Sequence, residues 1–141
     1  AYDFIQNRLS LKPEDIIIFG RSLGGAVAAN LAIRRSHRVL ILESTFTSIG
    51  AIARQYYPMF PVRLISRIKY NTLACVKEIS TPLLLIHSTE DGTIPFSHSE
   101  NLYEAASQPK VLLRISGDHN DGFLRSGAYY IEGIDKFLKD N

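Results

Sequence analysis

Apolar residues gather in four short runs along the chain, separated by segments in which apolar residues recur at helical spacing. The runs cover residues 15–20, 37–43, 81–87 and 110–115. Each predicts a strand with apolar side chains on both faces. Helices are expected at 1–10, 22–35 and 95–107. A last helix is expected after a loop at 116–122, and its apolar stripe is formed by Tyr130, Ile134, Phe137 and Leu138.

This alternation favours an α/β fold with about four strands in a mostly parallel sheet flanked by helices. Connections between successive neighbours would place the intervening helices on one face of the sheet. The length of 141 residues predicts a single domain spanning 1–141. The chain begins at Ala1, without Met and within a helical pattern, so we expect a fold that is incomplete at its N-terminus.

Composition narrows the class of protein. The net charge is +2 and no basic block is present, which argues against a nucleic-acid partner. The single cysteine, Cys75, excludes an internal disulfide and gives no metal cluster. No apolar run approaches the length of a membrane span, and no signal peptide is visible.

A Gly-x-Ser-x-Gly sequence lies between the first predicted strand and the helix that follows it. It runs from Gly20 to Gly24 with Ser22 at its centre. This is the pattern of a nucleophile elbow, in which glycines allow a sharp turn that exposes the serine hydroxyl above the sheet edge. We therefore expect Ser22 to be a nucleophile; the alternative is a tight turn of structural importance only.

A serine nucleophile needs a general base. Three downstream histidines compete for this role: His87, His98 and His119. His119 lies in the loop after the last strand, where the base of an α/β hydrolase is found. His87 ends the third strand and is expected to have a supporting role, and His98 is expected at the surface of a helix. His37 is expected to be a solvated residue at the start of a strand.

The base in turn needs an acid that orients it. Asp91 directly follows the third strand and precedes His119, which is the expected order. Glu43 is the rival, because it ends the second strand at the same edge of the sheet. Asp118 and Asp121 are interpreted as loop residues.

Together these motifs resemble the C-terminal part of an α/β-hydrolase-fold serine hydrolase. The elbow Gly20–Gly25, the segment Glu43–Ser48, the acid loop His87–Pro95 and the histidine loop around Gly117 are similar to the branch with protein depalmitoylases and serine-aminopeptidase-like hydrolases. Ser88 and Asp118 depart from that pattern, since glycine is common at both positions.

The resemblance implies hydrolysis of an ester, thioester or amide by acyl transfer, without a metal or organic cofactor. Ser22, His119 and Asp91 would form the catalytic triad, and the Leu23 backbone N–H would bind the oxyanion. The substrate would be a small molecule or an acylated partner. The alternative is a non-catalytic α/β-hydrolase module or an inactive fragment that retains the triad residues.

The resemblance also implies a small cap over the site at about 46–78. This segment is basic and aromatic, and an acyl pocket could be lined by Tyr56, Tyr57, Met59 and Phe60. Those side chains could equally pack the cap onto the core. A basic cap could also contact an anionic membrane surface. The sequence indicates neither the oligomeric state nor the cellular location.

Overall fold

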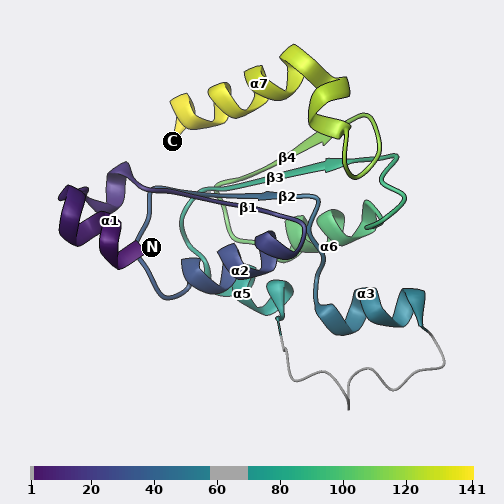
Figure 1. The fold of residues 1–141 in the computed structure, drawn as a ribbon, viewed down its shortest axis with the longest axis horizontal. Coiled ribbons are helices and arrows are strands. Elements are labelled where there is room, and N and C mark those ends of the chain that lie inside the picture. Colours follow the sequence, from purple (N-terminus) through teal and green to yellow (C-terminus); the bar gives the residue numbers. More distant parts are fainter. Residues whose placement is uncertain (1, 58–69) are drawn as a thin grey trace.

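The computed structural model describes residues 2–57 and 70–141. Its centre is a sheet of four parallel strands in the order β1-β2-β3-β4 (Figure 1). The strands are β1 (Ile17–Arg21), β2 (Val39–Glu43), β3 (Leu83–Ser88) and β4 (Lys110–Ile115). The predicted parallel α/β sheet is confirmed, and every strand bound lies within two residues of the end of its apolar run.

Helices cover both faces of this sheet. The helices of the described residues are α1 (Tyr2–Leu9), the short 3-10 helix η1 (Pro13–Asp15), α2 (Leu23–Ala32), α3 (Ile49–Tyr56), α5 (Thr72–Glu78), α6 (Ser97–Ala105) and α7 (Gly122–Asp140). The crossover helices α2, α5 and α6 pack side by side on one face, as predicted, and α7 lies on the other (Figure 1). In the described ranges no helix combines the length and the hydrophobicity needed to cross a lipid bilayer.

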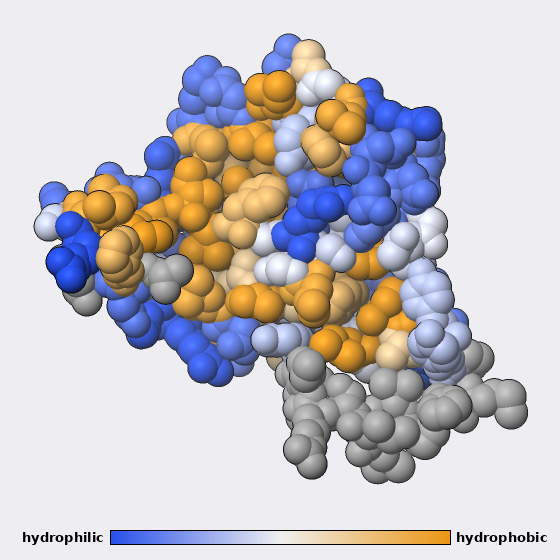
Figure 2. All heavy atoms as spheres, viewed as in Figure 1, coloured by the Kyte–Doolittle hydropathy of each residue, from blue (hydrophilic) through white to orange (hydrophobic). Residues whose placement is uncertain are grey.

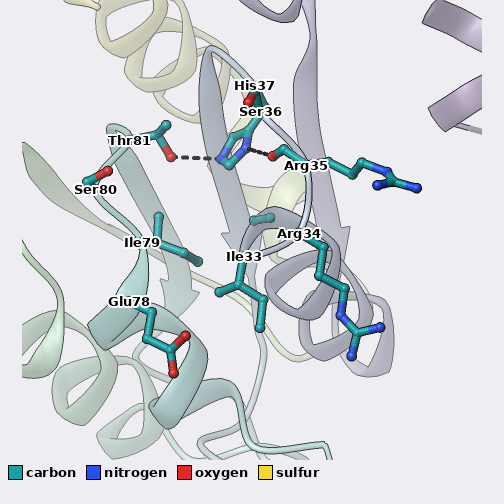
Figure 3. A pocket seen from close by; sticks show the side chains of 10 residues that line it. Ile33, Arg34, Arg35, Ser36, His37, Glu78, Ile79, Ser80 and Thr81 are labelled. Carbon is teal, nitrogen blue, oxygen red and sulfur yellow. Dashed lines mark hydrogen bonds between the residues drawn. The ribbon is translucent and has the colours of Figure 1, made fainter.

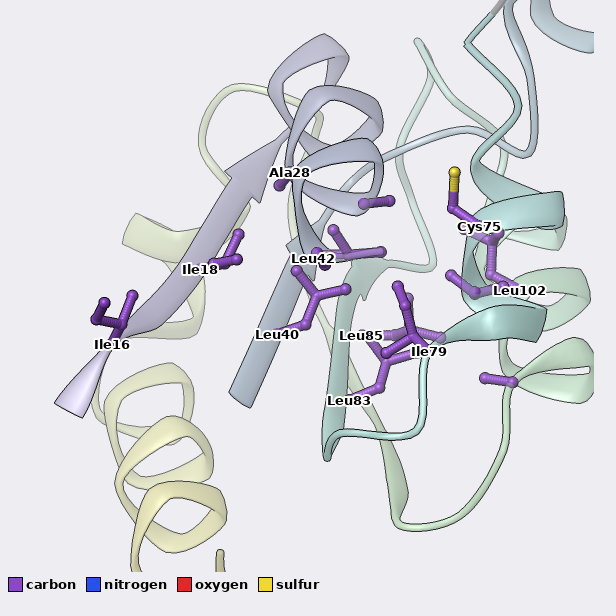
Figure 4. Packing of buried hydrophobic residues seen from close by; sticks show 14 of the residues in the cluster. Ile16, Ile18, Ala28, Leu40, Leu42, Cys75, Ile79, Leu83, Leu85 and Leu102 are labelled. Atoms are coloured by element: carbon purple, nitrogen blue, oxygen red, sulfur yellow. The ribbon is translucent and has the colours of Figure 1, made fainter. Parts of the chain in front are cut away.

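The larger hydrophobic core lies between the sheet and the α2, α5 and α6 layer. Leu40, Leu42, Leu83 and Leu85 point toward these helices from the two central strands (Figure 4). Helix α2 presents alanines to the sheet, among them the fully buried Ala29, so its backbone can approach closely. Helix α5 belongs to this layer although its sequence lies within the range predicted for the cap.

A smaller core lies under α7. Phe137 is buried there against β2, β3 and β4, and Tyr130, Ile134 and Leu138 pack beside it. The predicted apolar stripe of the last helix is thus confirmed. Gly127 has a φ of 49°, a left-handed conformation that bends α7 within its length.

The prediction that every strand is apolar and buried on both faces is wrong for β1. Ile18 is buried against α2, but Ile17 and Phe19 on the opposite face are 42% and 48% exposed. The reason is that α7 packs on β3 and β4 and does not extend over β1. Figure 2 shows the resulting hydrophobic surface over β1, between α1 and α7. Strand β4, at the other edge, is also partly exposed.

Candidate active site

Ser22 lies at the sharp turn between β1 and α2. Its φ of 53° and ψ of −123° are unfavourable for a residue with a side chain, at a cost of about 1–3 kcal/mol. The turn is held by the last residue of β2, Glu43, and by Thr45, two residues beyond it. The Ser22 N–H donates to the Glu43 carbonyl at 2.9 Å, and the Thr45 hydroxyl donates to the Ser22 carbonyl at 2.8 Å. The strained backbone is therefore fixed from the neighbouring strand.

Two glycines around Ser22 are required by close packing. A Cβ at Gly20 would lie 2.3 Å from the Gly24 carbonyl oxygen, and one at Gly25 would lie 2.6 Å from the Thr45 side chain. A Cβ at Gly24 would meet no described atom within 4 Å. The five-residue motif therefore identifies one of the two tight positions. The doubled glycine at 24 and 25 was the available signal for the other.

The structure brings together the three side chains predicted for the triad. His119 Nε2 lies 3.1 Å from Ser22 Oγ, and His119 Nδ1 lies 2.7 Å from Asp91 Oδ2. The three residues follow β1, β3 and β4, whose carboxyl ends meet at one edge of the sheet. This geometry allows the hydroxyl proton to pass to an imidazole whose other nitrogen is hydrogen-bonded to a carboxylate.

Asp91 is held firmly for this contact. Its side chain is fully buried, and its Oδ1 accepts hydrogen bonds from the Thr93 and Ile94 N–H groups at 2.9 and 2.8 Å. Its Oδ2 faces His119 and also His87 Nε2, which is 3.2 Å away. The carboxylate therefore presents one oxygen to backbone donors and the other to two imidazoles.

His87 is the second imidazole beside Asp91. It is fully buried, with Nε2 2.8 Å from the Ile94 carbonyl and Nδ1 2.6 Å from the Ser99 hydroxyl. Burial lowers the pKa of His87, which favours the neutral ring. In that form Nε2–H donates to the carbonyl and Nδ1 accepts from Ser99. His87 thus supports the acid loop, and its ring does not contact Ser22.

The two residues that depart from the family pattern both link the acid loop to the histidine loop. The Ser88 hydroxyl donates to the Gly117 carbonyl. Asp118 Oδ1 accepts from the Gly92 N–H at 3.0 Å and from the His119 N–H at 2.7 Å. These two hydrogen bonds lower the pKa of the Asp118 carboxyl group. A glycine at either position could not make these side-chain contacts.

Two histidines predicted to be exposed are buried, so both predictions are wrong. His98 faces inward from α6, and its Nδ1 accepts from the Thr47 N–H at 3.2 Å. The two ring nitrogens of His37 both have partners: Nδ1 lies 2.8 Å from the Arg35 carbonyl oxygen, and Nε2 lies 2.7 Å from the Thr81 hydroxyl (Figure 3). In each case one or both ring nitrogens are hydrogen-bonded to polar groups from a distant or irregular segment. No local sequence pattern reveals such partners.

Glu43, the rival acid, lies at the same sheet edge but is engaged elsewhere. Its buried carboxylate pairs with Arg21 Nε at 3.1 Å and accepts from the Tyr130 hydroxyl at 2.7 Å. None of its described contacts is to His119.

The predicted oxyanion donor lies at the start of α2, whereas the described residues of the predicted pocket lie at the end of α3. Leu23 begins α2, and within the described residues its N–H has no hydrogen-bond acceptor, as expected at the positive end of a helix. The Tyr56 hydroxyl donates to the Thr93 carbonyl beside the acid, and Tyr57 is largely exposed. Met59 and Phe60 lie outside the described residues.

A hollow of about 400 Å³ lies at the opposite edge of the sheet (Figure 3). It is formed by the segments that lead into β2 and β3, residues 32–37 and 78–81, and is therefore remote from Ser22. Within 2–57 and 70–141, no three His, Cys, Asp or Glu side chains are placed to hold a metal ion.

Comparison with known proteins gives relatives of the whole chain. An uncharacterised Escherichia coli K12 protein, YfhR, is 38% identical over 144 residues, covering 98% of this chain and 50% of YfhR. Human α/β hydrolase domain-containing protein 17B is 31% identical over 141 residues, covering 98% of this chain and 46% of the human protein. The chain thus spans about half the length of the curated relatives it matches.

A solved structure shares the fold. The Pyrococcus furiosus esterase PF2001 superposes with a TM-score of 0.77 at 19% identity, covering 99% of this chain and 59% of the esterase. The sequence profile of the prolyl oligopeptidase family matches residues 1–140. The resemblance found from the motifs is therefore confirmed, and the chain belongs to the prolyl oligopeptidase family of α/β-hydrolase-fold hydrolases.

Proposed function

We propose that this protein is a serine hydrolase that transfers an acyl group through Ser22, His119 and Asp91. The observation that carries the proposal is the continuous hydrogen-bonded chain from the Ser22 hydroxyl through His119 to the buried Asp91 carboxylate. Membership of a hydrolase family supports it. The strained backbone at Ser22 also supports it, because such strain is concentrated at functional sites.

In the first half of the reaction, Ser22 Oγ attacks the substrate carbonyl carbon while its proton passes to His119 Nε2. Asp91 holds Nδ1–H of the ring and stabilises the imidazolium ion. The negative charge on the carbonyl oxygen is stabilised by the Leu23 N–H at the start of α2. The tetrahedral intermediate collapses, and His119 gives its proton to the leaving group.

In the second half, water attacks the acyl-enzyme ester. His119 takes a proton from the water, and the new tetrahedral intermediate expels Ser22 Oγ, which recovers that proton. The products are the free carboxylic acid and a regenerated hydroxyl. Neither half requires a metal or an organic cofactor.

The substrate class is proposed as an ester, thioester or amide. Tyr56 contacts the acid loop through its hydroxyl, so α3 reaches the edge of the site and could contribute to an acyl pocket. An esterase and a peptidase family are both among the proteins similar to this chain, in keeping with this substrate class.

Hydrolysis of short p-nitrophenyl esters by the wild-type chain and by Ser22→Ala tests the proposal. Ser22→Ala should lose nearly all turnover while circular dichroism remains unchanged. The matched control is Ser116→Ala, which removes an exposed hydroxyl after β4 at the same sheet edge and should leave turnover intact. Equal turnover by Ser22→Ala and wild type, above the uncatalysed rate, would refute the serine mechanism. A folded wild-type chain with no turnover would favour a non-catalytic module.

A further inference from the structure

Arg21 directly precedes Ser22 and is not used in the proposed reaction. Its guanidinium group nevertheless makes two contacts at the site. Nε donates to Glu43 Oε1 at 3.1 Å, and a terminal nitrogen donates to the main-chain carbonyl oxygen of His119. The residue beside the nucleophile is thus connected to the backbone of the residue that carries the base, 98 positions away in the sequence.

The partner of Arg21 is itself fixed. The Glu43 side chain is only 3% exposed, and its second oxygen accepts from the Tyr130 hydroxyl of α7 at 2.7 Å. Burial, and then the hydrogen bond to Glu43, raise the pKa of Tyr130, so the phenol stays protonated as a donor. The guanidinium carbon also lies 5.9 Å from the centre of the Phe123 ring. Arg21 is therefore held on several sides.

The histidine loop needs such a contact. Asp91 fixes one end of the His119 ring, but the position of the other end depends on the backbone of an irregular loop between β4 and α7. The His119 N–H is bound by Asp118 Oδ1, within the same loop. The carbonyl is bound by Arg21 from β1, the strand that carries the nucleophile. This contact therefore sets the loop backbone relative to Ser22 directly.

We propose that Arg21 is a positioning residue for the base: it binds the His119 carbonyl so that Nε2 faces Ser22, and Glu43 and Tyr130 hold the guanidinium group in place. The inference rests on the proposed function. A planar guanidinium group can donate to a carboxylate and a carbonyl in fixed directions at the same time, whereas an ammonium group has no such geometry. Glu43 thus acts through Arg21, and its carboxylate does not orient the base ring directly.

The test measures the second-order rate constant for labelling of Ser22 by a fluorophosphonate probe, together with kcat and KM for a p-nitrophenyl ester. Arg21→Gln and Arg21→Lys should reduce the labelling rate and kcat about 10- to 100-fold, because small misplacements of a catalytic group are costly. KM should change less than threefold. Tyr130→Phe should give a smaller loss in the same direction.

The matched control is Arg125→Gln. Arg125 pairs with Asp121 of the same loop through Nε at 2.8 Å but does not contact the His119 carbonyl. It should keep the wild-type rate. A second control is rescue: the Arg21 side chain is 32% exposed, so guanidinium ion at tens of millimolar should reach the gap left by Arg21→Ala and restore part of the rate. Sodium chloride of equal ionic strength should not.

Thermal unfolding separates positioning from general loss of structure. If an Arg21 variant unfolds near the assay temperature, guanidinium rescue of Arg21→Ala at a lower temperature decides the result, since denaturation is not reversed by guanidinium. If the wild-type chain is labelled and folded Arg21 variants show the same labelling rate and kcat, this inference alone is overturned. A wild-type chain that the probe does not label at Ser22 would overturn the proposed function, and this inference with it.

Discussion

Replacement of Asp91 by Asn tests the assignment of the acid with little change in shape. The Asn side-chain oxygen can still accept from the Thr93 and Ile94 N–H groups, which now bind Oδ1. The amide nitrogen would replace Oδ2, which faces His119 Nδ1 at 2.7 Å. Because that nitrogen can only donate, His119 Nδ1 would have to accept. The ring would then carry its proton on Nε2, and it could not take the proton of Ser22.

The expected cost follows from this change of tautomer. The corresponding Asp-to-Asn change in the serine protease template lowers kcat by about 10⁴. At about 1.4 kcal/mol for each factor of ten, the barrier would rise by roughly 5 kcal/mol. The fold should survive, since loss of one buried hydrogen-bonding partner costs about 1–3 kcal/mol. We therefore expect a folded, nearly inactive Asp91→Asn protein.

The matched control is Glu43→Gln, the same chemical change at the neighbouring strand end. Gln keeps an acceptor for Arg21, so the loss of turnover should not exceed about tenfold. Turnover of a p-nitrophenyl ester would be measured for both variants, with circular dichroism as the check on folding. A larger loss for Glu43→Gln than for Asp91→Asn would refute the reasoning and transfer the role of acid to Glu43.

Three further predictions concern packing, pH and the sheet edge. Gly25→Ala should lower the free energy of unfolding in urea by about 1–3 kcal/mol, because its Cβ would lie 2.6 Å from the buried Thr45 side chain. Gly24→Ala should be tolerated, and equal losses of stability in the two variants would contradict this prediction. Burial lowers the pKa of His98 below its ordinary 6.5, so the unfolded chain binds more protons, and the free energy of unfolding should fall as the pH drops below about 6.5. His98→Gln should make that fall shallower, and an unchanged slope would argue against it. Phe19→Lys should reduce self-association in sedimentation experiments, because Phe19 is an exposed apolar residue of an edge strand; undiminished association would place the contact elsewhere.

The features that the sequence predicted are those with a local signature. Buried strands read as apolar runs, and the Gly20–Gly24 turn identifies Ser22. The order of the motifs, together with the resemblance, selected Asp91 and His119, and in the structure His119 contacts both Asp91 and Ser22. Their catalytic roles remain predictions.

The features that the sequence did not predict depend on distant partners. The exposure of Ile17 and Phe19 is set by where α7 packs, which no pattern within β1 reveals. The burial of His98 depends on Thr47, 51 residues away. The contact of Arg21 with the His119 carbonyl joins residues 98 positions apart. Glu43 was a rival for the acid because a carboxylate at the end of a strand can either orient the base or, as in the structure, bind Arg21.

The central claim is that Ser22 is the nucleophile activated by His119. Mass spectrometry of the wild-type chain after treatment with a fluorophosphonate probe tests it most directly, because the modified peptide identifies the reactive oxygen. We expect one adduct, on the peptide that contains Ser22, and none in His119→Gln over the same time. An adduct on a different residue, or equal modification of Ser22 in His119→Gln, would contradict it.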